Sequence, residues 1–242
     1  MTLDDILASL FPSGHRVERG PWGTLHGSAE VEGSGKVTVV GMADGTPLGV
    51  DAAILLAGHV LAAVEGGDRA PIVILLDTAS QNMARRDELL GLNEYLAHLT
   101  KCLALAAARG HRTVSILFGG AAAGAFIAGA LSSQSLVALP GAEPSVMDLP
   151  SISRVTKLPL DTLEELAKST PIFAPGVKPL FATGALTESW AADQPYAPRL
   201  ADLLRQPTAK ADRRDQVGLE RKGRLLAQKI AERVSAEAAA HA

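Results

Sequence analysis

The chain has little cysteine, few aromatic residues and no long hydrophobic run. A single cysteine, Cys102, excludes an internal disulfide framework and a metal site built from cysteines. Aromatic residues make up 4 % of the 242 residues, and alanine and leucine dominate the apolar set. The longest apolar stretches contain glycine, histidine or charged residues and are shorter than a membrane span. Because the first residues are acidic where a secretory signal is basic, we expect a cytoplasmic protein.

The charge balance and several missing motifs exclude whole classes of function. A net charge of −3 gives no general attraction to nucleic acid or to an anionic membrane, so we expect neither as a partner. The segment Gly33-Ser34-Gly35-Lys36 resembles a phosphate loop but has Glu30 and Val37 where that motif needs a glycine and a hydroxyl. Dinucleotide-binding and nucleophile-elbow motifs are absent. The six histidines show no metal-ligand spacing, so we expect no metal.

Alternating strand and helix patterns predict an α/β fold with a parallel sheet. Expected strands cover residues 37–40, 72–76, 113–118 and 136–139. Expected helices cover 52–65 with Asp51 as N-cap, a long segment from after Ala84 to about Arg109, 160–168, a piece after Pro175, and 198–205. Residues 13–27 are expected to form a loop. A charged helix with an apolar stripe at Leu219, Leu226, Ile230 and Val234 is expected over 211–239. We therefore expect one domain over 1–205 and a helical tail over 206–242.

The run from Gly119 to Ala130 is the most informative segment, because ten of its twelve residues are Gly or Ala. It follows an expected strand and leads into an expected helix. Small side chains let another group approach the backbone closely, and the first amides of a helix have no partners inside it. Close packing of a small-residue helix is the alternative explanation for this run.

A junction of the same kind comes earlier in the chain, at residues 77–82, directly after the apolar strand 72–76. In open α/β sheets ligands gather beyond the carboxyl ends of the strands. If the two strands are neighbours, one backbone amide from each junction can point at a single oxygen. Two such amides on a thioester carbonyl stabilise the enolate that forms when a β-carboxylate leaves as CO₂, with each donor contributing on the order of 3 kcal/mol.

Three separated motifs resemble a known family. The pattern from Leu76-Asp77-Thr78 through a long helix and a strand to the Gly/Ala turn resembles the ClpP/crotonase-like carboxyltransferase fold, a superhelix of ββα units. The closer similarity is to the gamma subunit of biotin-independent malonate decarboxylase. It is carried by the segments 118–126 (FGGAAAGAF), 149–157 (LPSISRVTK) and 173–176 (FAPG), and it spans roughly residues 30–205.

The resemblance implies a heteromeric carboxy-lyase. A gamma subunit of this family pairs with a homologous beta subunit, and the pair removes CO₂ from a malonyl thioester on an acyl carrier protein. The carrier bears the CoA-like prosthetic group, so this chain is expected to bind no cofactor itself. By position, the family's oxyanion amides correspond to Ser80 or Ala79 and to Ala123 or Gly124. We further predict substrate-binding positions at Ala79, Gly119, Gly120, Ala121 and Arg154, with a helix-capping role as the alternative for Arg154.

Departures from the pattern leave alternatives open. Ala79-Ser80 replaces the Pro-Gly of the carboxyltransferase motif, so the partner subunit is an alternative source of the oxyanion hole, and this chain would then be a structural subunit. A stand-alone hydratase or hydrolase is a third hypothesis, which Phe126 disfavours because it stands where hydratases of this fold carry a carboxylate. Arg85 and Arg86 open the long helix, where a cation is unfavourable, so either a ligand or partner carboxylate holds one of them or both are solvated.

Overall fold

The computed structural model describes residues 1–171, 174–207 and 211–241 of the chain. The chain forms two compact units. Unit 1 comprises Met1–Val146 and Ser189–Thr208, and unit 2 comprises Met147–Glu188 and Ala209–Ala242. Each unit is made of two separate segments of the chain. The expected boundary between residues 205 and 206 stays a prediction. No helix in the described ranges is long and apolar enough to cross a membrane.

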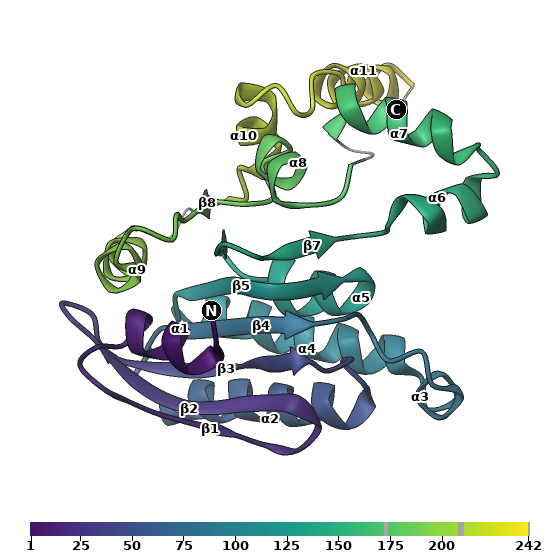
Figure 1. Ribbon diagram of the computed structural model, residues 1–242. Coiled ribbons are helices and arrows are strands. Elements are labelled where there is room, and N and C mark those ends of the chain that lie inside the picture. Colours follow the sequence, from purple (N-terminus) through teal and green to yellow (C-terminus); the bar gives the residue numbers. More distant parts are fainter. Residues whose placement is uncertain (172–173, 208–210, 242) are drawn as a thin grey trace. The chain divides into compact units, whose positions relative to one another are not determined.

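Unit 1 is built on a mixed sheet with helices on both faces (Figure 1). Its strands lie in the order β1-β2-β3-β4-β5-β6-β8, and β7 pairs with β5. The first three strands are antiparallel, whereas β3, β4, β5 and β6 are parallel. The bounds are β1 (His15–Arg19), β2 (Thr24–Val31), β3 (Gly35–Gly45), β4 (Ile72–Thr78), β5 (Thr113–Ala122), β6 (Ser135–Ala138), β7 (Glu143–Ser145) and β8 (Glu188–Ser189).

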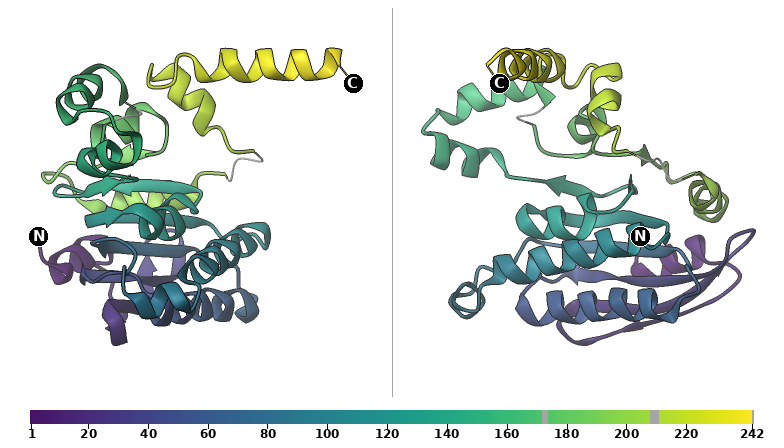
Figure 2. Two further views of the ribbon diagram at one scale, coloured as in Figure 1. Left: turned by 90° about the vertical axis from the view of Figure 1, so that its right-hand side faces the viewer. Right: turned by 180° about the vertical axis from the view of Figure 1, so that it is seen from behind.

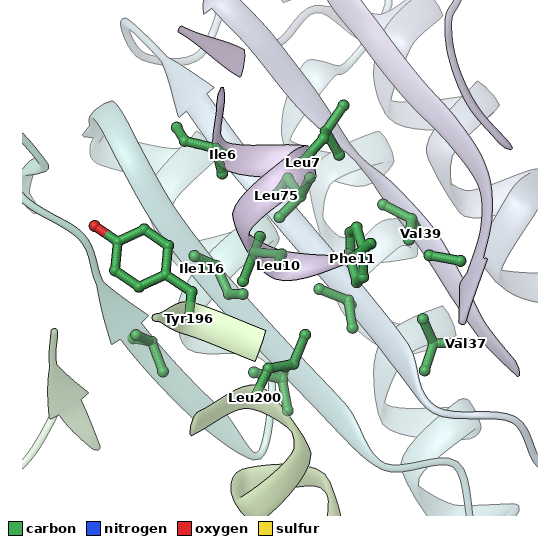
Figure 3. Close-up of a cluster of buried hydrophobic side chains, with 14 of the residues drawn as sticks. Ile6, Leu7, Leu10, Phe11, Val37, Val39, Leu75, Ile116, Tyr196 and Leu200 are labelled. Carbon is green, nitrogen blue, oxygen red and sulfur yellow. The ribbon is translucent and has the colours of Figure 1, made fainter. Parts of the chain in front are cut away.

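The helices of unit 1 form two layers. One face of the sheet carries α2 and α4, which Figure 2 shows side by side in its right-hand view. The other face carries α1 and α9, whose apolar side chains meet those of the sheet in Figure 3. The bounds are α1 (Leu3–Leu10), α2 (Val50–Gly66), α3 (Arg85–Leu89), α4 (Leu92–Ala108), α5 (Ala123–Phe126) and α9 (Tyr196–Arg205), with a 3₁₀ turn η1 (Pro21–Gly23) and a π-helical turn η2 (Ile127–Leu131).

The buried strand predicted at residues 72–76 is confirmed. Every residue from Ile72 to Leu76 in β4 is at most 4 % exposed, as a strand between two helix layers requires. Val73 and Leu75 belong to the cluster formed with α1 and α9, which includes Leu10, Phe11 and Leu200 (Figure 3). The alternate residues of β4 face the other helix layer. The two parallel strands that carry the predicted site are therefore held from both sides.

The expectation of a loop over residues 13–27 is wrong. This segment forms β1 and the start of β2, an antiparallel pair at the edge of the sheet. Most side chains of β1 are exposed, so the strand lacks the apolar alternation that identifies a strand in sequence. The pairing with β2, not an apolar face, holds β1 in place.

Two helix predictions need correction. Asp51 is not the N-cap of α2, because that position is occupied by Gly49 and Asp51 lies in the first turn. The Asp51 carboxylate instead accepts hydrogen bonds from Arg86. The expected single helix up to Arg109 is two helices, α3 and α4, separated at Gly91. Gly91 adopts a left-handed conformation with φ of 79°, which interrupts regular helix.

Unit 2 consists of short helices: α6 (Leu149–Thr156), α7 (Leu160–Ser169), α8 (Val177–Ala182), α10 (Arg214–Glu220) and α11 (Ala227–Ala240). Asp148 caps α6 through a hydrogen bond from the Ser151 N–H. Arg221 donates to the carbonyls of Phe181 and Leu186, and its guanidinium lies 3.7 Å from the centroid of the Phe181 ring. The segment after α10 is thus joined to the end of α8.

The tail is not the continuous helix expected over residues 211–239. It breaks between α10 and α11, where Lys222 has a positive φ of 62°. The last helix, α11, runs straight in Figure 2. Leu226, Ile230 and Val234 of the predicted stripe are 59–68 % exposed. Within the described part of unit 2, these three side chains of the stripe are therefore not covered.

A histidine pair on unit 1 leads to a prediction about pH. His26 of β2 and His59 of α2 stack with ring centroids 4.5 Å apart. Burial, and to a smaller extent the charge of His26, lower the pKa of His59 below its ordinary value of 6.5. The native state therefore binds a proton at His59 less readily than the unfolded chain, so its contribution to stability is present above pH 6.5 and is lost as the pH falls.

We expect the His59→Phe variant to lose part of this acid sensitivity. Between pH 7.5 and 5.5 its unfolding temperature should fall less than that of the wild type, because phenylalanine cannot take up the proton. Circular dichroism melts at several pH values measure the difference. Parallel pH profiles for the two proteins would show that His59 has no such effect.

Candidate functional site

The two strand-to-helix junctions predicted to form a site lie side by side. β4 and β5 are parallel neighbours, and Thr78 at the end of β4 is paired with Ala121 near the end of β5. Ala79 and Ser80 follow β4 directly, and Ala123 and Gly124 begin α5 directly after β5. The condition that these strands be neighbours is therefore met. The roles of the individual residues stay predictions.

Gly119, Gly120 and Ala121 belong to β5 and not to a turn before the helix, as had been expected. The pairing with β4 shifts between Leu76–Leu117 and Thr78–Ala121, so β5 has two more residues than β4 over this stretch. On the other side of β4, the pairing shifts between Met42–Leu76 and Gly45–Thr78, and β3 has one extra residue. Asp77 is thus the β4 residue that lies between a bulge in β3 on one side and a bulge in β5 on the other.

The Asp77 carboxylate joins the two bulges. Its Oδ2 accepts a hydrogen bond from the Gly45 N–H of β3 at 3.2 Å, and its Oδ1 accepts from the Gly120 N–H of β5 at 3.1 Å. A side chain on Gly119 would place its Cβ 2.1 Å from Asp77 Oδ1. The glycine therefore provides the space that the carboxylate occupies. Because the Gly120 N–H is taken by Asp77, it is not free to bind a ligand in this structure.

The loop after β4 uses most, but not all, of its backbone donors. The Ala79 N–H donates to the Gly45 carbonyl at 3.2 Å, and the Ser80 carbonyl accepts from the Leu48 N–H at 2.9 Å. The Ser80 N–H has no hydrogen-bond acceptor among the residues that the structure describes. Among the predicted donors, the Gly124 N–H is occupied by Gln81, whereas the Ser80 N–H is available.

The beginning of α5 contacts this loop. The Gly124 N–H donates to Oε1 of Gln81 at 2.6 Å, so the second junction is bound by a side chain from the first. Ala123, the residue before it, has a φ of 53°, a left-handed conformation that costs a non-glycine residue about 1–2 kcal/mol. Backbone strain of this kind is found preferentially at functional sites. Phe126, in the same helix, is fully buried and supplies no carboxylate.

A cavity of about 340 Å³ opens beside the same loop and is lined in part by Trp22, Asn82 and Arg86. Arg86 pairs with Asp51 and with the buried Asp87, whose other carboxylate oxygen accepts from Asn82 at 2.7 Å. This hydrogen-bonded pairing lowers the pKa of Asp51 and raises that of Arg86. Arg86 is therefore an exposed cation that is paired with carboxylates of its own chain.

Two parts of the predicted site lie elsewhere. Arg154, a predicted substrate-binding residue, is an exposed residue of α6 in unit 2, whereas the other predicted residues are in unit 1. Its role stays a prediction. Of the segment 173–176, Phe173 lies outside the described residues, while Gly176 is the N-cap of α8 with a φ of 102°.

Two residues that matter for the geometry were given no individual task from the sequence. Asp77 was part of the motif Leu76-Asp77-Thr78, and Gln81 was one of several polar residues in the junction 77–82, which could be either turn residues or part of a site. An acidic residue directly after a fully apolar strand was the available signal for Asp77. The position of Gln81 after a buried strand favoured a site role, but its partner could not be predicted because it lies 43 residues further along the chain.

The architecture is the crotonase-like α/β fold, which this chain shares with solved structures of a malonate decarboxylase and of transcarboxylase 12S. Residues 43–238 match the model of the malonate decarboxylase gamma subunit family. The chain therefore belongs to this family, and the resemblance found in the sequence is confirmed.

Individual relatives give the same result. The malonyl-S-ACP:biotin-protein carboxyltransferase MADD of Malonomonas rubra is 32 % identical over 127 residues, which cover 51 % of this chain and 44 % of that protein. A chain in the crystal structure of a Pseudomonas malonate decarboxylase MdcD–MdcE hetero-dimer is 25 % identical with a TM-score of 0.72. A chain of a Pseudomonas malonate decarboxylase hetero-tetramer in complex with coenzyme A is 22 % identical with a TM-score of 0.77. Both alignments cover 96 % of this chain and 97 % of the other.

Proposed function

We propose that this chain is one half of a heteromeric, cytoplasmic malonyl-thioester decarboxylase. With a homologous beta-type subunit, it removes CO₂ from a malonyl thioester on an acyl carrier protein and leaves the acetyl thioester. Membership of the gamma subunit family supports the reaction. The solved hetero-dimer and the curated relative, whose names include MdcD–MdcE and malonyl-S-ACP, support the partner and the carrier.

The reaction needs charge stabilisation more than it needs a reactive side chain. The C–C bond to the carboxylate breaks, its electrons move into the thioester as an enolate, and CO₂ departs. A proton then adds to the α-carbon to give the acetyl group. Donors fixed around the thioester oxygen stabilise the enolate and can each contribute about 3–4 kcal/mol. The chain binds no cofactor in this scheme, since the CoA-like group belongs to the carrier.

The observation that carries the proposal is the direct contact between the two junctions at the ends of β4 and β5. It places the free N–H of Ser80 in the loop that also binds the start of α5. Ala123 and Gly124 remain the predicted donors from the second junction. Ala79, Gly119, Gly120 and Ala121 remain the predicted substrate-binding positions beside them, and Arg154 remains a predicted contact for a phosphate or carboxylate.

The proposal is tested by purifying the chain together with its partner subunit and measuring CO₂ release from malonyl thioester on the carrier. We expect the assembled pair to be active and the isolated chain to be inactive. An intact pair without activity contradicts the proposed function, and activity of the isolated chain on acyl-CoA favours the stand-alone enzyme.

The alternative of a structural subunit is supported by one observation, namely that the Gly124 N–H is already bound to Gln81. In that case the partner supplies the working oxyanion hole. Ala123→Leu separates the two hypotheses, provided that gel filtration shows the pair still assembles. Unchanged turnover favours the structural role, whereas a large loss of kcat places the reaction beside Ala123.

A further inference from the structure

The side chain of Gln81 stands between the predicted backbone donor and any ligand. Its Oε1 accepts a hydrogen bond from the Gly124 N–H with a distance of 2.6 Å, at the short end for N–H···O bonds. A Cβ on Gly124 would come within 3.0 Å of both Gln81 Oε1 and Leu96 Cδ1. The missing side chain at position 124 thus provides the space in which the carboxamide lies.

The chemistry of this contact fixes the orientation of the carboxamide. A peptide N–H donates, so the atom that faces it has to be the acceptor oxygen and not the amide nitrogen. Nε2 therefore points away from Gly124. In the described part of the chain, this NH₂ group has no acceptor within hydrogen-bond distance, and Gln81 is half-buried. The result is an oriented donor without a partner.

A second unpaired donor lies on the adjacent residue. The Ser80 N–H also lacks an acceptor among the described residues, and the backbone on both sides of it is fixed by bonds from Leu48 and Asn82. Leu48 N–H binds the Ser80 carbonyl, and Asn82 N–H binds the Leu48 carbonyl, each at 2.9 Å. The loop that carries both donors is thus held to the chain before α2.

We propose that Gln81 is a catalytic residue, whose NH₂ group donates to the thioester oxygen as it becomes an enolate. This inference rests on the proposed decarboxylase function and identifies the donor within it. Gly124 is then a positioning residue, because its N–H orients the carboxamide instead of binding substrate. By accepting that bond the carboxamide also becomes more polarised, which strengthens its own donation.

This arrangement explains how the second junction contributes although its N–H is occupied. For direct donation to substrate, the Gly124 N–H would have to leave Gln81 in every turnover. Donation through the Gln81 NH₂ group, which we call the relay, keeps the bond between Gly124 and Gln81. The donor that faces substrate is then the far side of the carboxamide. The relay also provides the preorganisation on which oxyanion stabilisation depends, because the donor is fixed before substrate binds.

Gln81→Glu is the decisive variant. Its carboxylate still accepts from the Gly124 N–H but offers no N–H to substrate. In the assembled pair with its partner subunit, we expect kcat on malonyl thioester to fall about 10²- to 10³-fold, the loss typical of removing one oxyanion donor, with a much smaller change in KM. Thermal unfolding and assembly should be close to those of the wild type.

Gln134→Glu is the matched control. Gln134 also accepts from a backbone N–H, that of Thr113 at 3.1 Å, but at the opposite end of β5. We expect this variant to retain the wild-type kcat. Equal kcat for Gln81→Glu and the wild type would overturn the inference, since the Gly124 contact alone would then suffice.

Gln81→Ala distinguishes the relay from direct donation. It removes the carboxamide and exposes the Gly124 N–H to substrate. The relay predicts a loss of kcat at least as large as that of Gln81→Glu, whereas kcat at or above the wild-type value means that Gly124 is the donor and overturns the relay. An inactive but intact wild-type pair contradicts the proposed function itself, so the two failures are distinguishable.

Discussion

Replacing Gly119 with alanine is expected to destabilise unit 1 by roughly 2–4 kcal/mol, whereas the same change at Gly120 should cost less than about 1 kcal/mol. The new Cβ at position 119 would lie 2.1 Å from Oδ1 and 2.9 Å from Cβ of Asp77, so the whole carboxylate has to move. At Gly120 the nearest atom, the Thr78 carbonyl oxygen, is 3.4 Å away, which is ordinary contact.

The comparison is sharp because the two glycines are neighbours in one strand. Thermal melts measure it directly, with about 2–4 °C expected for each kcal/mol in a protein of this size. Decarboxylation by the assembled pair should fall with Gly119→Ala as well, since Asp77 holds the strand that leads into α5. Similar stability of the two variants would show that the space at Gly119 is not needed.

The second large effect is expected for Asp77→Asn. The change keeps the shape of the side chain but replaces one acceptor oxygen with an NH₂ group that faces a peptide N–H. Either Gly45 or Gly120 then loses its acceptor, and the remaining bond is no longer charge-assisted. We expect a loss of about 2–4 kcal/mol in the free energy of unfolding, measured by urea titration.

Asp148→Asn is the control for this substitution. Asp148 also accepts from a backbone N–H, that of Ser151 at 2.7 Å, but at the exposed beginning of α6, where asparagine is an equally good cap. We expect a change within about 0.5 kcal/mol. If both substitutions had equally small effects, the two bonds of Asp77 would contribute little to stability.

The parallel core could be predicted from sequence because its signals are local. Residues 72–76 are apolar throughout and four of the six residues 113–118 are apolar, and each segment is followed by small or polar residues, which indicates a strand that ends at a helix. The helix α1 has an equally local signal, since Leu3, Ile6, Leu7 and Leu10 follow the helical period, and all four are buried. These parts depend only on the order of residues along the chain.

The rest depends on partners that are distant in sequence. Asp51 resembles an N-cap, but Arg86 pairs with it across 35 residues. The bulge at Gly119 and Gly120 looked like a turn, because only Asp77 in the neighbouring strand explains why the backbone stays extended there. The same holds for the site. The sequence predicts that the two junctions are adjacent, but it does not predict which group accepts the hydrogen bond from each backbone N–H.

The bulges on either side of Asp77 divide β3 and β5 each into two segments, one before the bulge and one after it. Before the bulge, a one-residue insertion in β5 would turn Val114 and Ile116 to the wrong face of the sheet. Beyond it, the extra residues are already accommodated, and the alternation of the core no longer constrains the length of the chain. Loops at the ends of β3 and β5 are therefore the places where residues can be inserted or exchanged with the least effect on the scaffold.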